Sequence, residues 1–119
     1  MRQELAENIY QQCPIIYRGR HQGPDKNLMC FGFDCGSGWY DQILTLSIQI
    51  EKLTEKLRDR GVELGYLPMV TQVKEKYAGP RFYLTVSTDE MGELISKAEE
   101  DSLCICEECG AEEKLMTAY

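Results

Sequence analysis

The sequence predicts a single α+β domain spanning residues 1–119, in which an antiparallel β-hairpin or small sheet packs against one long and one or two shorter helices. Apolar residues repeat at helical spacing for some twenty positions after Gly38, which predicts a long core-facing helix. Alternating apolar residues flank the turn signal at residues 78–80, which predicts a hairpin. A second amphipathic helix follows, so the order of elements is typical of an α+β domain.

The first third of the chain holds a short helix and irregular segments. Residues 5–12 have helical periodicity, and the Cys13-Pro14 pair ends the helix because the residue before proline is pushed out of the α region. Residues 15–17 are too few to distinguish a brief strand from a buried extended segment. Residues 18–27 form a polar loop punctuated by glycine and proline. The apolar residues 28–33 fit either a strand or a buried loop.

The long helix is the clearest element of the sequence. Ser37 is a natural N-cap and Gly61 a natural stop just after the last turn. Leu46 and Ile50 lie in the middle of the apolar stripe and are therefore predicted core residues. The apolar residues follow steps of four and three, at Trp39, Ile43, Leu46, Ile50, Leu53 and Leu57.

The hairpin and the last helix follow in the second half. Residues 69–77 and 81–87 form the predicted strands. The segment from Ser87 to Glu90 matches a capping box, which predicts a helix that begins there. The alternating apolar positions of the second strand are Phe82, Leu84 and Val86, and those predicted to face inward from the helix are Met91, Leu94, Ile95 and Ala98.

Composition and charge limit the classes of protein to which the chain can belong. The chain has 119 residues, is 43% hydrophobic and 28% charged, and contains no apolar run of the roughly 20 residues that a membrane span needs. The start, residues 1–7, lacks the apolar region of a secretory signal, so we expect a cytoplasmic protein without membrane contact.

The acidic residues are concentrated near the end of the chain. Net charge is −7, yet Asp89 to Glu113 holds ten acids and one base, Lys97, which gives −9, while the remaining ten acids and twelve bases give +2. Phosphates would be repelled there, so a nucleic acid partner is not expected. A solvated helix face that maintains solubility is the first interpretation of this segment, and a basic protein surface is the partner that its charge would suit. The predicted partner-binding residues are Glu90, Glu93, Glu100 and Asp101.

Two basic or glycine-rich segments are candidates for anion binding. Gly36, Ser37 and Gly38 precede the long helix, where free N–H groups and the helix dipole attract anions, although the lysine of a P-loop is missing. Arg18, Arg20 and His21 share the polar loop and fit a phosphate or an acidic partner. A tight capping turn and a solvated loop are the respective structural alternatives.

Six cysteines are many for this length, and three of them cluster near the end of the chain. Cys106 and Cys109 followed by glycine resemble one knuckle of a zinc site, with Cys104 close by. A structural zinc needs four ligands, so another would have to come from a distant residue, namely Cys13, Cys30, Cys35 or His21. We expect free thiols and no cofactor, with zinc as the alternative, and without a secretion signal we expect no disulfide framework.

The residues offer no catalytic arrangement. His21 is the sole histidine, and no serine or carboxylate is spaced to complete a triad with it. We therefore predict that the protein is not an enzyme.

Three segments taken together resemble a family of small uncharacterised proteins carried by tailed phages and prophages. The segments are FGFDCGSGWYD at residues 31–41, QVKEKYAGPRFY at 72–83 and CEECG at 106–110. The resemblance implies a phage accessory protein acting in the cytoplasm of a bacterial host. The corresponding function is binding that inhibits or modulates a host protein, such as a component of an anti-phage defence. A nucleotide- or small-anion-binding protein and a small structural zinc protein are the alternatives.

Overall fold

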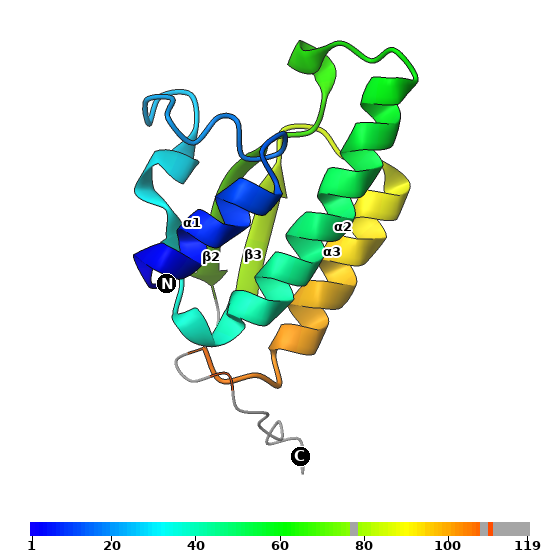
Figure 1. Ribbon diagram of the computed structural model, residues 1–119. Coiled ribbons are helices and arrows are strands. Elements are labelled where there is room, and N and C mark those ends of the chain that lie inside the picture. The colour runs from blue at the N-terminus through cyan, green and yellow to red at the C-terminus, as the bar shows by residue number, and fades with distance from the viewer. Residues whose placement is uncertain (77–78, 108–109, 111–119) are drawn as a thin grey trace.

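In the computed structural model, the helices lie on one side of a small mixed sheet (Figure 1). The structure describes residues 1–76, 79–107 and 110. Helices α2 and α3 lie side by side and run in opposite directions, and α1 lies next to α2 (Figure 1). In the described residues the α-helices are α1 (Gln3–Gln12), α2 (Tyr40–Asp59) and α3 (Asp89–Ser102); the 3-10 helices are η1 (Leu28–Phe31), η2 (Ser37–Trp39) and η3 (Leu64–Tyr66); and the strands are β1 (Phe33–Asp34), β2 (Val70–Lys76) and β3 (Gly79–Leu84).

The sheet has the order β1-β2-β3 in the described part of the chain. Strands β2 and β3 are antiparallel, which confirms the predicted hairpin, although Ala78 of the predicted turn lies outside the described residues. Strand β1 adds a parallel pair, so Val73 has Phe33 as its partner on one side and Phe82 on the other. The segment 28–33 thus divides between a 3-10 turn and the start of a strand.

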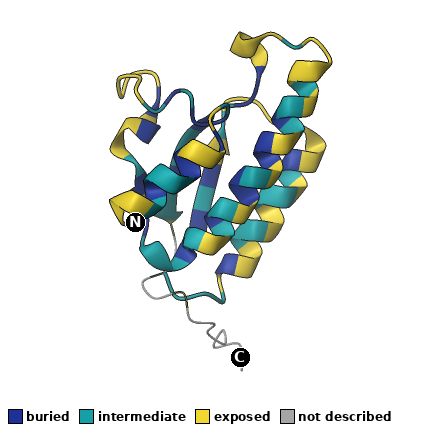
Figure 2. Cartoon of the chain, viewed as in Figure 1, coloured by how far each residue is buried: buried dark blue, intermediate teal, exposed yellow. Residues whose placement is uncertain are grey.

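The predicted stripe of the long helix forms the centre of the core. Leu46 is 4% exposed and Ile50 is fully buried, as the sequence predicts. Leu53 and Leu57 are half-buried, so the stripe becomes less deeply covered towards the end of α2. In Figure 2, buried stretches alternate with exposed ones along α1 and α2. The other elements contribute to the core chiefly through Ile9, Tyr10, Val73, Phe82 and Met91.

The helix ends differ in part from the sequence prediction. Gly61 ends α2 as expected, with φ at 98° and the paired hydrogen bonds of a Schellman motif. Ser37 does not cap the helix, because the helical turn begins at Ser37 itself. Thr88, rather than Ser87, caps α3 by accepting a hydrogen bond from the Met91 backbone N–H at 3.3 Å. The predicted capping box is therefore wrong by one residue.

Residues 15–17 form neither of the two predicted structures; they lie in a turn. The buried carboxylate of Glu51 on α2 holds this turn by accepting hydrogen bonds from the backbone N–H groups of Ile15 at 3.0 Å and Ile16 at 2.9 Å. Burial raises the pKa of Glu51, while these two hydrogen bonds oppose the shift. Val86, the last of the alternating apolar positions in the predicted strand 81–87, is exposed because β3 ends at Leu84.

None of the helices in residues 1–76 and 79–107 is long and apolar enough to cross a membrane.

Candidate functional site

The glycine-rich segment before α2 contacts the segment that follows α3. The Gly36 backbone N–H donates to Glu107 Oε2 at 2.8 Å, and the Gly38 N–H donates to the Glu107 carbonyl oxygen at 2.5 Å. The indole N–H of Trp39 donates to the carbonyl oxygen of Ile105 at 2.9 Å. Two of the three N–H groups predicted to face an external anion, those of Gly36 and Gly38, are therefore occupied by the chain's own Glu107.

The same contact explains the two glycines. A Cβ atom at Gly38 would lie 2.0 Å from the Cys106 carbonyl oxygen, and one at Gly36 would lie 2.4 Å from the Glu107 carbonyl oxygen. Backbone can approach backbone this closely only where no side chain intervenes. The sequence left two interpretations of this segment, an anion-binding site and a tight turn. The tight turn is the one that explains why glycine occupies positions 36 and 38.

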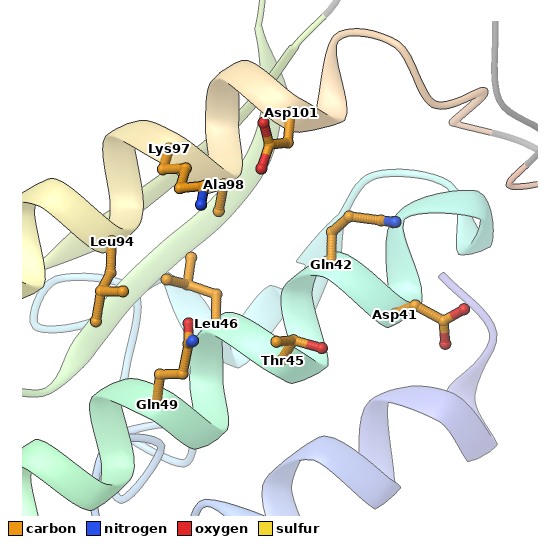
Figure 3. Close-up of a pocket in the computed structure, with 9 residues that line it drawn as sticks. All are labelled: Asp41, Gln42, Thr45, Leu46, Gln49, Leu94, Lys97, Ala98 and Asp101. Carbon is orange, nitrogen blue, oxygen red and sulfur yellow. The ribbon is translucent and has the colours of Figure 1, made fainter.

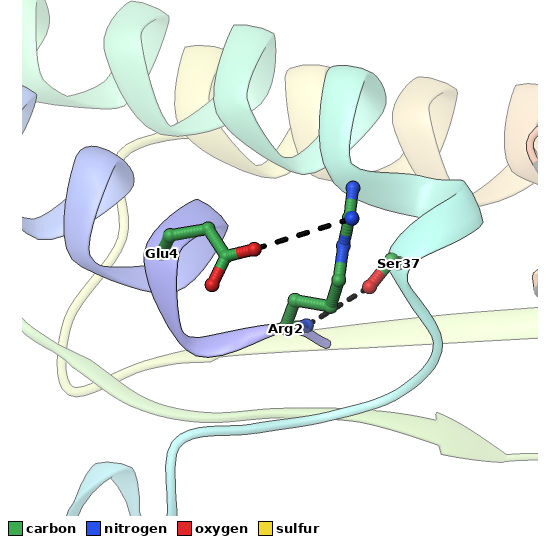
Figure 4. A network of polar contacts seen from close by, with 3 residues as sticks. All are labelled: Arg2, Glu4 and Ser37. Carbon is green, nitrogen blue, oxygen red and sulfur yellow. Dashed lines mark hydrogen bonds and ion pairs between the residues drawn. The ribbon is translucent and has the colours of Figure 1, made fainter.

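The start of the chain joins this junction from the other side. The amino group of Met1 donates to the Cys35 carbonyl oxygen, and the Arg2 backbone N–H donates to Ser37 Oγ at 2.9 Å. Figure 4 shows this second bond beside the ion pair of Arg2 and Glu4. That pair spans 4.0 Å between two exposed side chains, so it contributes little to stability. Ser37 is thus a structural hydrogen-bond acceptor in the described structure.

Replacing Gly38 with alanine is expected to separate the two segments and to lower the free energy of unfolding by about 1–3 kcal/mol, the usual range for overpacking. Faster hydrogen exchange at the Gly38 amide should accompany the loss. Gly65 is the matched control, because a Cβ there meets nothing within 4 Å. Equal stability of the two alanine variants in chemical denaturation would contradict the close packing described for Gly38.

The guanidinium of Arg18, a predicted anion-binding residue, is occupied by hydrogen bonds to backbone carbonyl groups. Its guanidinium donates to the carbonyl oxygens of Ile15 at 2.8 Å, Leu64 at 2.8 Å, Leu67 at 2.7 Å and Pro68 at 2.9 Å. Burial lowers the pKa of Arg18, and the carboxylate of Glu51 opposes that shift. Through these hydrogen bonds Arg18 holds η3 against the turn that contains Ile15. No pattern in the sequence predicts this role.

The anion-binding candidates do not converge on one site. Arg18 contacts η3, which projects beyond one end of α2, whereas the segment before α2 lies at the other end (Figure 1). Arg20 contacts α1, where its Nη1 atom lies 3.5 Å from the Glu7 carboxylate. His21 is exposed and lines the same hollow as Arg20. The structure therefore does not bring Arg18, Arg20 and His21 together with Gly36–Gly38 into one anion-binding site.

The cysteines differ in their surroundings. Burial raises the pKa of the Cys13 thiol to about 12 and that of Cys35 to about 11. Cys30 is exposed, Cys104 and Cys106 are half-buried, and Cys109 lies outside the described residues. Within residues 1–76, 79–107 and 110, no group of three or more metal-binding side chains is close enough to hold an ion.

We predict that the purified protein carries less than one equivalent of zinc, because Cys104, Cys106 and Cys109 have no evident fourth ligand in the sequence. Elemental analysis of the protein, with Cys106→Ser as the comparison, checks this expectation. One tightly held zinc per chain that disappears in Cys106→Ser would contradict it.

The acidic face of α3 is arranged as the sequence predicts. Glu90, Glu93, Glu100 and Asp101 are all exposed, while Met91 is fully buried. Leu94, Ile95 and Ala98 are half-buried and pack on the core. Glu99 lies at the boundary, where its Oε2 atom accepts a hydrogen bond from the Phe82 backbone N–H at 3.1 Å.

A groove of about 350 Å³ runs between α2 and α3 beside this acidic face. Leu46 and Leu94 face each other across it, and the carboxylate of Asp101 points from α3 towards α2 (Figure 3). Gln42 also lines the groove, and its Oε1 atom is buried without a hydrogen-bond partner in the described part of the chain.

No family model matches the chain, and neither a curated protein nor a solved structure matches it.

Proposed function

We propose that the protein is a non-enzymatic phage accessory protein that binds a basic surface of a bacterial host protein, such as a component of an anti-phage defence, and inhibits or modulates it. The observation that carries the proposal is the acidic face of α3, defined by Glu90, Glu93, Glu100 and Asp101, all exposed along one helix. The phage setting rests on the resemblance of the sequence motifs.

The groove beside this face supports a protein partner over a purely solubilising role. The charged residues that line the groove are Asp41, Asp101 and one cation, Lys97. A lysine or arginine of the partner fits this lining, since its apolar stem can lie along Leu94 and Ala98 while its charged head meets the carboxylates, which outnumber the single lysine. Charge on the acidic face would attract the partner, and the groove would hold one of its side chains.

The competing anion-binding function has less support. It requires Arg18 and the N–H groups of Gly36 and Gly38, and these donors already bond to the chain's own carbonyl and carboxylate oxygens. An anion would have to displace several intact hydrogen bonds to bind there, at a cost of roughly 1 kcal/mol for each bond.

Reversing Glu93 and Glu100 to lysine is expected to slow association with the partner about tenfold and to weaken its salt dependence, because long-range attraction acts mainly on the association rate. The partner is first captured with the tagged protein from its bacterial host and identified by mass spectrometry. Surface plasmon resonance at several salt concentrations then gives the rates.

Asp59→Lys with Glu63→Lys is the matched control, because both residues are exposed and the change in net charge is the same. Arg20→Glu with His21→Glu tests the basic loop. Normal association of the α3 variant together with lost binding of the loop variant would overturn the proposal and leave the acidic face as a solubility device.

A further inference from the structure

A second hollow, separate from the acidic face, lies between α1 and the segment 29–33. Its volume is about 400 Å³, which is within the range of small-molecule sites. One face of α1 forms the first wall, through residues spaced at one helical turn such as Gln3, Ala6 and Tyr10. The loop residues Arg20 and His21 close one side.

The floor of the hollow is aromatic and apolar. Tyr10 and Phe33 line the hollow and stack with ring centroids 5.5 Å apart. The buried ring of Tyr17 supports both from the core, edge-on at 5.4 and 5.6 Å. Met29 is buried beside them. Phe31, which also lines the hollow, is 71% exposed, so its ring is accessible to a ligand. A flat apolar ligand matches such a lining.

Hydrogen-bond donors gather in the same hollow. The guanidinium carbon of Arg20 lies 4.3 Å from the centre of the Tyr10 ring. Among the described residues its one ion pair is to Glu7, which leaves most of its five N–H donors without a partner there. Within the described residues, neither the Tyr10 hydroxyl nor the His21 imidazole forms a hydrogen bond. These groups together can bind a carboxylate or a phosphate.

We infer that this hollow, lined by Tyr10, Arg20, His21, Phe31 and Phe33, binds a small molecule that combines a planar aromatic ring with one anionic group. The ring lies against Phe31 and the apolar floor, and the anionic group accepts hydrogen bonds from Arg20, Tyr10 and His21. A nucleoside monophosphate and a simple aromatic acid share this chemistry. Burial raises the pKa of Tyr10, although Arg20 opposes the shift, so the hydroxyl remains a donor at neutral pH.

The test is a titration of ¹⁵N-labelled protein followed by NMR, with adenosine monophosphate and phenyl phosphate as the two probes. Adenosine, phenol and inorganic phosphate are the matched controls. We expect at least one probe to shift the amides of Ala6, Gly32 and His21, and to bind at least about tenfold more tightly than its neutral counterpart and than phosphate. Binding of adenosine monophosphate alone identifies a nucleotide site, and binding of phenyl phosphate identifies a site for small aromatic acids.

Variants separate this site from unspecific charge effects. Arg20→Met and Phe31→Ser should each weaken binding about tenfold, whereas Lys26→Met, which removes an exposed charge from the same loop, should not. The inference is overturned if neither probe shifts these amides up to about 5 mM, or if inorganic phosphate binds as well as the probes. Undiminished binding in Arg20→Met and Phe31→Ser would also overturn it. The outcome is independent of the α3 partner site, which contains none of these residues.

Discussion

Replacing Leu46 with alanine is expected to lower the free energy of unfolding by about 2–5 kcal/mol, the usual cost of truncating a buried leucine. Leu46 is 4% exposed and lies in the middle of the core stripe of α2. The alanine leaves a cavity between α2 and α3 in addition to the lost apolar contact. Chemical denaturation followed by circular dichroism measures the change.

Leu64→Ala is the matched control, since the same side chain is removed at a position that is 61% exposed. We expect its free energy of unfolding to stay within about 0.5 kcal/mol of the unmodified protein. If Leu46→Ala and Leu64→Ala were equally stable, α2 would not form the centre of the core, and the fold described above would be wrong.

Replacing Arg18 with methionine is expected to lower the free energy of unfolding by about 2–4 kcal/mol, because hydrogen bonds to charged groups contribute more than neutral ones and their loss leaves carbonyl groups unpaired. The variant keeps the apolar stem and removes the donors to Leu64, Leu67 and Pro68. Amide hydrogen exchange in η3 should increase together with the loss of stability.

Arg58→Met is the control for the charge itself, because the Arg58 side chain is 54% exposed and its nearest ion-pair contact, to Asp59, spans 3.8 Å. We expect this change to leave the stability within about 0.5 kcal/mol. An Arg18→Met variant as stable as Arg58→Met would show that the guanidinium is not a structural tie, and would return Arg18 to the anion-binding candidates.

The elements with a strong local pattern could be predicted from the sequence. The apolar stripe from Trp39 to Leu57 identifies α2, and the alternation around Phe82 identifies the hairpin, because both patterns repeat within a few residues. Helical periodicity also predicts which acidic residues of α3 are exposed, because assigning Met91 to the core places them on the opposite face of the helix.

The remaining features depend on contacts between residues far apart in the chain. Strand β1 is two residues long and is defined by its pairing with β2. Glu51 binds backbone 35 and 36 positions away, and Glu107 binds Gly36 at a separation of 71. Arg18 reaches carbonyl groups up to 50 positions away. No local periodicity records such pairings, which is why Gly36, Gly38 and Arg18 looked like free anion-binding groups in the sequence.

We propose that the acidic face of α3 contacts a partner protein, and amide hydrogen exchange of the complex with the captured host protein is the direct test of this contact. We predict increased protection in the complex along α3, at Glu93, Lys97 and Asp101, and at Thr45 and Gln49 across the groove on α2. Protection confined to Arg20, His21 and η1, with α3 unchanged between free and bound protein, would contradict the claim.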